Sequence, residues 1–254
     1  MKQQIIGSEI LKFDELDSTN RFLSDLSKER AIKDGTVIVA GFQAAGRGQD
    51  TNTWHSTAGK NLLLSIYLKT GFMKTEKQFM LNKFVSLGLL DYLESIIDIS
   101  QHPVKIKWPN DIYVGNRKVG GILIQNQIQG SFMDHTIVGI GLNINEEKFP
   151  EDIPNPVSIY QLDENKLDLE DCLHKLLEAL DSRYQQISSG ADETLHVEYL
   201  ESLFRFNKQH KYKLNKEITI GTIKGVSEFG KLILEIEKES KEFDLKEIEF
   251  LFDD

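Results

Sequence analysis

A short polar loop contains the first residues whose types could do chemistry. It reads GFQAAGRGQDTNTWHS, spans residues 41–56 and directly follows an apolar run typical of a strand. Gly46 and Gly48 allow backbone N–H groups to approach an anion, and Arg47 adds planar, charge-assisted donors. A phosphate or carboxylate would suit this loop, although a tight turn with a surface arginine has the same composition. Trp54 can stack on an adenine, cover a ligand or belong to the core.

A second polar cluster is predicted where two extended segments meet. Residues 105–123 read KIKWPNDIYVGNRKVGGIL and place Lys107, Asp111 and Lys118 on consecutive strands joined by a short Gly-Asn turn. Two cations and one carboxylate would then lie close together. A salt-bridged surface hairpin is the alternative. The Trp-Pro pair is costly to expose, and the Gly-Gly pair weakens a strand unless a backbone or ligand must approach closely, so both pairs favour a site.

Two further motifs are weaker signals when taken singly. Residues 139–145 read GIGLNIN, which interrupts a buried strand as a simple glycine bulge also would. Residues 17–20 read DSTN, which is typical of a helix N-terminus with Asp17 or Ser18 as the cap. The ordinary interpretation of DSTN is a helix cap without any other role. Both motifs indicate a site only in combination with the other two.

The four motifs together, in this order and at these separations, resemble the catalytic domain of the biotin protein ligase family, in its stand-alone form. The resemblance covers about residues 13–145, and KWPND combined with KVGGIL is its most specific part. The related lipoate ligases share the fold but neither that combination nor a GRG loop followed by tryptophan. The resemblance implies biotin-[acetyl-CoA-carboxylase] ligase activity. In that reaction ATP, carrying Mg²⁺, activates biotin to biotinyl-5′-AMP, and biotin passes to one lysine of a biotin carboxyl carrier protein.

The resemblance also implies which residues contact biotin. Ser18, Thr19 and Asn20 match the residues that meet the ureido ring, and Gln43 matches their polar partner on the strand before the loop. The loop that orders over the ligand corresponds to Gly46, Arg47 and Gly48, with the arginine facing the biotin carboxylate and the α-phosphate.

The remaining implied roles concern ATP and the acceptor. Trp54 matches the tryptophan near adenine, and Asn143 matches the asparagine that recognises it. Lys118 matches the lysine on the reacting carboxyl and phosphate oxygens, while Asp111 would orient or deprotonate the acceptor lysine. Lys107 joins the catalytic set, facing the acceptor, the phosphates or solvent. The other expected ligand contacts are Asn110, Gly120, Gly121 and Gly141.

The loop departs from the most basic version of the family pattern, GRGRxGRxW. Here Gln49, Asp50, Thr51 and Asn52 supply no positive charge, and Asp50 adds a negative one. We therefore expect a loop that holds biotinyl-AMP less tightly than the basic version does.

These motifs need a sheet to position them, and the sequence predicts an α+β fold. Apolar runs at 36–42, 61–68, 104–108, 111–127 and 135–145 indicate a mixed, largely antiparallel sheet with helices packed on it, as in the class II synthetase-like catalytic fold of the family. Helices are expected at 75–99, 168–187 and 193–204, and a surface loop at 146–160. Short glycine-punctuated strands then predict a small SH3-like β-barrel. The expected domains are 1–204 and 205–254.

Composition limits the function further. A chain of 254 residues, 40% of them hydrophobic, can form one large domain and a small one. A net charge of −10 argues against a nucleic-acid partner, and because DSTN begins at Asp17 we expect no winged-helix repressor domain. No segment is typical of a signal peptide or membrane span, and a single cysteine makes no internal disulfide. We expect a cytoplasmic monomer or homodimer with no metal site of its own; a lipoate or octanoate ligase and a noncatalytic nucleotide sensor are the rival interpretations.

Overall fold

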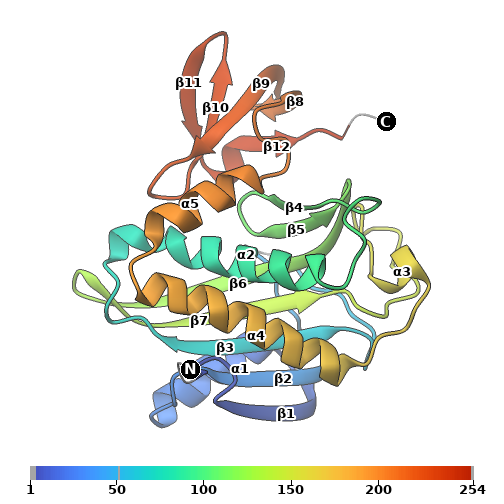
Figure 1. Ribbon diagram of the computed structural model, residues 1–254, viewed down its shortest axis with the longest axis vertical. Coiled ribbons are helices and arrows are strands. Elements are labelled where there is room, and N and C mark those ends of the chain that lie inside the picture. Colours follow the sequence, from blue (N-terminus) through green and yellow to red (C-terminus); the bar gives the residue numbers. More distant parts are fainter. Residues whose placement is uncertain (1–3, 51, 253–254) are drawn as a thin grey trace.

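The main body of the molecule is a seven-stranded sheet (Figure 1), in a computed structural model that describes residues 4–50 and 52–252. The ends of the expected domains at 1 and 254, and Thr51 of the loop, lie outside the described residues. The strands follow the order β1-β2-β3-β7-β6-β5-β4. Their bounds are β1 (Glu9–Leu16), β2 (Thr36–Gln43), β3 (Leu62–Lys69), β4 (Val104–Lys107), β5 (Asp111–Val114), β6 (Arg117–Gln129) and β7 (Phe132–Leu142).

The pairing of these strands confirms the predicted mixed, largely antiparallel sheet. Every neighbouring pair is antiparallel except β1 and β2, which run parallel. The sequence interpretation did not include β1, because EILKFDEL mixes charged and apolar residues without strict alternation. As an edge strand with mostly exposed or half-buried side chains, β1 needs no strong apolar pattern.

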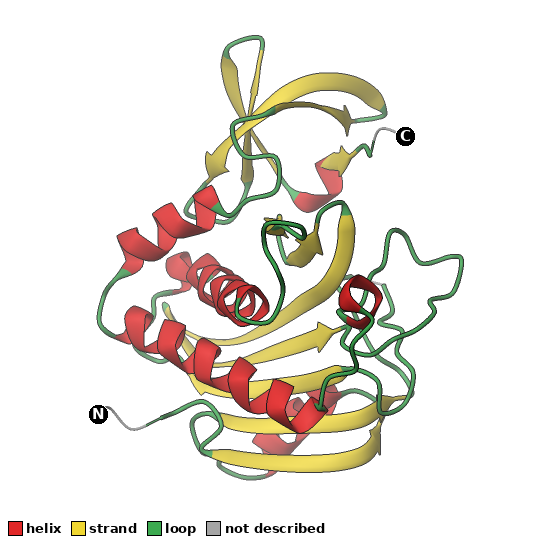
Figure 2. Cartoon of the chain, turned by 45° about the vertical axis from the view of Figure 1, so that its right-hand side comes forward, coloured by secondary structure: helices red, strands yellow, loops and turns green. Residues whose placement is uncertain are grey.

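Helices cover both faces of the sheet, but one face is covered only in part, which leaves room for a site. Figures 1 and 2 show α2 (Phe79–Glu94) and α4 (Leu169–Ser188) on one face, with α1 (Thr19–Glu29) on the other. The alternation of side chains along β2 reflects this: Val37 belongs to the large core under α2 and α4, while Ile38 belongs to the small core under α1. Because α1 covers only part of its face, the rest is open to a ligand.

The helices lie where they were predicted, but their first and last residues differ from the predicted ones. The expected helix at 75–99 is the 3₁₀ turn η1 (Thr75–Lys77) followed by α2, and the expected helix at 193–204 is α5 (Asp192–Glu201). The expected surface loop at 146–160 was partly wrong. Val157, Ser158 and Ile159 are buried, and the short helix α3 (Tyr160–Asp163) follows at once.

A second, antiparallel sheet follows α5, as predicted for the SH3-like domain. Its order is β11-β10-β9-β8-β12, formed by β8 (Gln209–Leu214), β9 (Glu217–Val226), β10 (Leu232–Ile236), β11 (Glu239–Phe243) and β12 (Ile248–Phe250), with the 3₁₀ turn η2 (Leu245–Glu247) before β12. The indole N–H of Trp108 donates to the carbonyl of Gly230 at 2.8 Å and ties the second sheet to the first. The tryptophan of KWPND is therefore buried as a contact between the two sheets.

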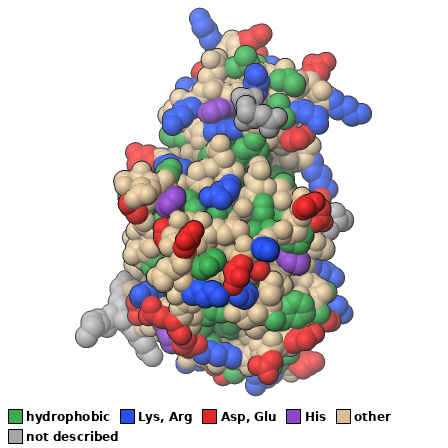
Figure 3. Space-filling model, turned by 90° about the vertical axis from the view of Figure 1, so that its right-hand side faces the viewer, with side chains coloured by type: hydrophobic (Ala, Val, Ile, Leu, Met, Phe, Trp, Pro, Cys, Tyr) green, Lys and Arg blue, Asp and Glu red, His purple; other side chains and the backbone are tan. Residues whose placement is uncertain are grey.

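Acidic and basic side chains are interspersed on the face of the molecule shown in Figure 3. In residues 4–50 and 52–252, no group of three or more His, Cys, Asp or Glu side chains could hold a metal ion. Within the same ranges, no helix has the length and apolar character needed to cross a membrane.

Candidate active site

One cavity of about 380 Å³ collects most of the predicted site residues. It lies among the start of α1, the loop after β2, the strands β3, β6 and β7, and the turn between β4 and β5. The predicted residues that line it are Ser18, Thr19, Asn20, Gln43, Arg47, Gly48, Trp54, Lys107, Asn110, Asp111, Lys118, Gly121 and Gly141. Four motifs that are far apart in the sequence thus meet around one space.

The DSTN motif forms the start of α1, as expected, and Ser18 is its N-cap. The backbone N–H of Thr19 donates to Gln43 Oε1 at 2.8 Å. Ser65, fully buried on β3, places its Oγ 2.7 Å from Thr19 Oγ1 and 2.5 Å from Asn20 Oδ1. Asn20 Nδ2 in turn donates to the carbonyl of Leu123 at 3.1 Å. These contacts fix two α1 side chains against two strands of the sheet.

The proton positions in this network follow from the chemistry of the groups. Asn20 Oδ1 carries no proton, so the Ser65 hydroxyl must donate to it. The Thr19 hydroxyl has a single proton, which it donates either to Ser65 Oγ at 2.7 Å or to Gln43 Oε1 at 3.1 Å, and its oxygen can also accept. Gln43 uses Oε1 as an acceptor for Thr19, which leaves its two amide N–H groups as donors for a ligand. The cavity therefore offers a donor and an acceptor side by side.

The predicted group of two cations and one carboxylate is confirmed. Lys118 Nζ lies 2.6 Å from Asp111 Oδ1, and Lys107 Nζ lies 3.9 Å from Asp111 Oδ2. Burial lowers the pKa of the Lys107 ammonium; Asp111 opposes that shift, and the positive charge of Lys118 adds to it. The Lys107 ammonium also lies over the rings of Phe250 and Tyr113, at 4.9 and 5.6 Å from their centres. The strands β4, β5 and β6 thus present a compact, positively charged group to the cavity.

Trp54 packs flat on the sheet because two strand positions have no side chain. A Cβ on Gly141 would lie 2.4 Å from the indole Cε2, and one on Gly121 would lie 3.0 Å from Cζ3. Lys118 Nζ lies over the same indole at 5.6 Å from its centre. Gly121 of KVGGIL and Gly141 of GIGLNIN are therefore explained by the tryptophan that they accommodate.

Three predicted contacts lie outside the cavity lining. Gly46 is buried under the loop, where its carbonyl accepts from Trp54 N at 3.0 Å. Gly120 faces the opposite side of the sheet, since a Cβ there would lie 2.9 Å from Leu142 Cδ1. Asn143 is buried; its Nδ2 donates to the carbonyl of Val157 at 3.1 Å, and its Oδ1 has no partner among the described residues.

Several residues of the site were missed by the sequence interpretation. Ser65 is a lone hydroxyl in the apolar run LLLSIYL, a signal that could have been noticed. Gly139 of GIGLNIN is another, since a Cβ there would lie 2.3 Å from Asn20 Oδ1. Leu245 and Lys246 of η2 also line the cavity, and Lys246 Nζ lies 2.7 Å from Asp50 Oδ2 of the loop. No local sequence signal predicts this contribution from the second sheet.

Comparisons with known proteins agree with this geometry. The model of the biotin/lipoate A/B protein ligase family matches residues 12–143, which include the first three motifs in full and GIGLNIN as far as Asn143. The chain belongs to this family. The predicted resemblance, fold and ligase class are thereby confirmed, and the protein is a ligase of the biotin/lipoate type.

Relatives and solved structures extend the match beyond the catalytic region. The bifunctional ligase/repressor BirA of Bacillus subtilis is 25% identical over 98% of this chain and 76% of its own length. The biotin-[acetyl-CoA-carboxylase] ligase of Mycobacterium tuberculosis is 26% identical over 86% of this chain and 80% of its own. A biotin protein ligase from Aquifex aeolicus in complex with biotin and ATP superposes with a TM-score of 0.76 at 26% identity, covering 95% of this chain and 98% of that one.

Proposed function

We propose that this ligase activates biotin with ATP and transfers it to a lysine of a biotin carboxyl carrier domain. The observation that carries the proposal is the buried network of Thr19, Gln43, Asn20 and Ser65. A ureido ring has one carbonyl and two N–H groups, so it needs a donor and acceptors together, as Gln43 Nε2 and Thr19 Oγ1 provide. The dithiolane ring of lipoate and the alkyl chain of octanoate would leave these polar groups unpaired, at a cost of about 1–3 kcal/mol each.

The first chemical step needs positive charge more than it needs a base. The carboxylate oxygen of biotin forms a bond to the α-phosphorus of ATP, and the bond from that phosphorus to pyrophosphate breaks. Arg47 and Lys118 line the cavity and would neutralise the anionic groups that meet there, together with Mg²⁺ bound to ATP. Lys118 is held near the reaction by Asp111, so its ammonium is positioned before substrate binds.

The second step transfers the acyl group. The amine of the acceptor lysine attacks the acyl carbon, AMP leaves, and the amine must lose a proton. Asp111 is only 17% exposed in its side chain and is the carboxylate nearest the two lysines, which suits it to orient or deprotonate the incoming amine. We infer that the acceptor lysine takes over the position near Asp111 that Lys118 holds in the absence of acceptor.

We also propose that the protein is not a transcriptional repressor and acts on carrier proteins alone. A net charge of −10 opposes association with DNA. No change in DNA mobility at low salt would support this, and a sequence-specific shift would contradict it.

The deciding experiment is incorporation of labelled biotin into a carrier domain with ATP and Mg²⁺. We expect transfer by the natural protein, greatly slowed formation of biotinyl-AMP by Lys118→Ala, and intermediate without efficient transfer from Asp111→Ala. Lys12→Ala, which removes an exposed lysine paired with Glu170 on the edge strand, is the matched control. Pyrophosphate release that depends on lipoate and not on biotin would overturn the proposal.

A further inference from the structure

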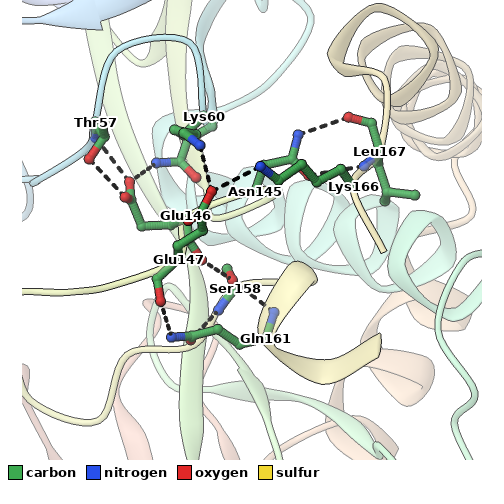
Figure 4. Close-up of polar contacts among 10 residues, drawn as sticks. Thr57, Lys60, Asn145, Glu146, Glu147, Ser158, Gln161, Lys166 and Leu167 are labelled. Carbon is green, nitrogen blue, oxygen red and sulfur yellow. Dashed lines mark hydrogen bonds and ion pairs between the residues drawn. The ribbon is translucent and has the colours of Figure 1, made fainter. Parts of the chain in front are cut away.

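Glu146 is a buried carboxylate just beyond β7 that the proposed reaction does not use. Its side chain is almost fully buried, and the residue is only 3% exposed. Oε2 accepts from Thr57 N at 2.9 Å and from Asn61 Nδ2 at 2.7 Å, while Oε1 accepts from the Thr57 hydroxyl at 2.7 Å (Figure 4). The Glu146 carbonyl accepts from Ser158 Oγ at 2.6 Å. These donors are all neutral, so the carboxylate is stabilised by hydrogen bonds.

These bonds tie together two segments that are far apart in the sequence. One runs from the end of the Gly-rich loop to the start of β3, at 54–61, and the other is the GIGLNIN segment with the glutamate that follows it. Asn61 Oδ1 also accepts from Ile144 N at 3.0 Å, and Asn145 N donates to the carbonyl of Lys60 at 2.8 Å. Glu146 is the centre of this junction, and Asn143 lies between the end of β7 and this glutamate.

The two joined segments contain several of the buried side-chain polar atoms that have no hydrogen-bond partner among the described residues. Among the described residues, Trp54 Nε1, Ser56 Oγ and Asn143 Oδ1 are buried and make no hydrogen bond. Ser56 is only 6% exposed and adjoins Thr57, which Glu146 holds by two bonds. Buried polar groups are normally paired, so these three point to a ligand with a complementary edge.

We propose that Glu146 is a positioning residue for the nucleobase of ATP and that Ser56 is one of the contacts it positions. The inference rests on the proposed function, which supplies ATP as the substrate. An adenine presents an amino donor flanked by ring-nitrogen acceptors. Asn143 Oδ1 is an acceptor, while the Trp54 indole and the Ser56 hydroxyl are donors, so the set matches adenine. A guanine has a carbonyl where adenine has its amino group, so it would place an acceptor against the acceptor Asn143 Oδ1 and lose that hydrogen bond.

The test compares four variants for ATP and biotin KM in biotin-dependent pyrophosphate exchange. Glu146→Ala should raise the KM for ATP about tenfold, as expected for loss of hydrogen bonds to a charged group, and leave the KM for biotin within about twofold. Ser56→Ala should raise the ATP KM several-fold and narrow the preference for ATP over GTP, with an unchanged melting temperature. Glu147→Ala is the matched control, since that neighbouring glutamate is exposed and pairs with Lys60 and Lys166.

Glu146→Gln separates positioning from charge. Its carbonyl oxygen can keep the two bonds to Thr57 N and Asn61, while its amide N–H can donate to the Thr57 hydroxyl, which both donates and accepts. This variant should therefore recover most of the ATP affinity lost in Glu146→Ala.

The outcomes are distinct. A natural protein without biotin-dependent exchange would contradict the proposed function, and direct titration with ATP alone would still test the nucleobase contacts. If Glu146→Ala lowers the melting temperature but leaves the ATP KM unchanged, or raises both KM values equally, the inference is wrong. Should Glu146→Ala not fold, Glu146→Gln and Ser56→Ala decide: an ATP KM in Ser56→Ala equal to that of the natural protein would overturn the inference.

Discussion

The two halves of the cavity differ in how complete they are before a ligand arrives. On the side of α1, Thr19, Asn20, Gln43 and Ser65 bond to one another and to the sheet. On the side of Trp54, three buried polar atoms have no partner among the described residues, and Arg47 is exposed on the loop. The first half is organised in advance for a small headgroup. Under the proposed function, the nucleotide would complete the second half, which would place the cost of ordering on nucleotide binding.

Lys118 lies where the two halves meet, and its loss should have the largest effect. It contacts Asp111 and lies over Trp54, so Lys118→Ala removes charge from the point where carboxylate and phosphate react. We expect the rate of adenylation to fall roughly 100- to 1000-fold, as for removal of a preorganised group that stabilises charge in a transition state. Single-turnover formation of biotinyl-AMP measures this, and a decrease below about tenfold would place the reacting atoms elsewhere.

Ser65→Ala should affect the organised half alone. It removes the hydroxyl that links Thr19 to Asn20 and leaves Asn20 Oδ1 buried without a donor. Such a loss costs about 1–3 kcal/mol, so the KM for biotin should rise about tenfold while the KM for ATP stays near its natural value. Steady-state kinetics with each substrate varied in turn gives both numbers. An equal rise in both KM values would mean that the two halves are not independent.

Arginines introduced into the loop should strengthen the incomplete half. Gln49 and Asn52 line the cavity at the positions where the basic family pattern has arginine. Gln49→Arg combined with Asn52→Arg should slow release of biotinyl-AMP about three- to tenfold through new charge-assisted bonds. Release is measured by chasing labelled intermediate with unlabelled biotin and ATP. Release from the natural protein that is already as slow as from a GRGRxGRxW ligase would contradict the expected weaker hold.

The smallest expected effect is the contribution of Lys107, which lines the cavity, to the pH dependence of folding stability. Burial lowers the folded-state pKa of Lys107, so the unfolded chain binds the proton more readily. The free energy of unfolding should therefore rise with pH between the lowered pKa of Lys107 in the folded protein and its pKa of about 10.4 in the unfolded chain. Below this pH range the buried ammonium destabilises the folded protein by its full amount. Lys107→Met should remove this rise. Urea unfolding at neutral and alkaline pH tests it, and identical pH profiles for both proteins would contradict it.

Much of the site could be predicted from short segments, because each motif has a local physical meaning. DSTN forms a helix start, and the Gly-rich loop follows a strand, as local chemistry requires. The β4–β5–β6 hairpins bring Lys107, Asp111 and Lys118 together because antiparallel strands with short turns place neighbours in register. These contacts span few residues, so the sequence alone determined them, along with the mixed sheet and the small second domain.

Other features depend on contacts between segments that are far apart. The edge strand β1, Ser65 under α1, the Glu146 junction and the approach of Lys246 to Asp50 join residues tens to hundreds of positions apart. A lone serine or glutamate has the same local appearance on a surface as in a core. Only the tertiary structure decided which of them is buried, because burial and partner choice arise when whole elements pack and each buried polar group must find its hydrogen bond.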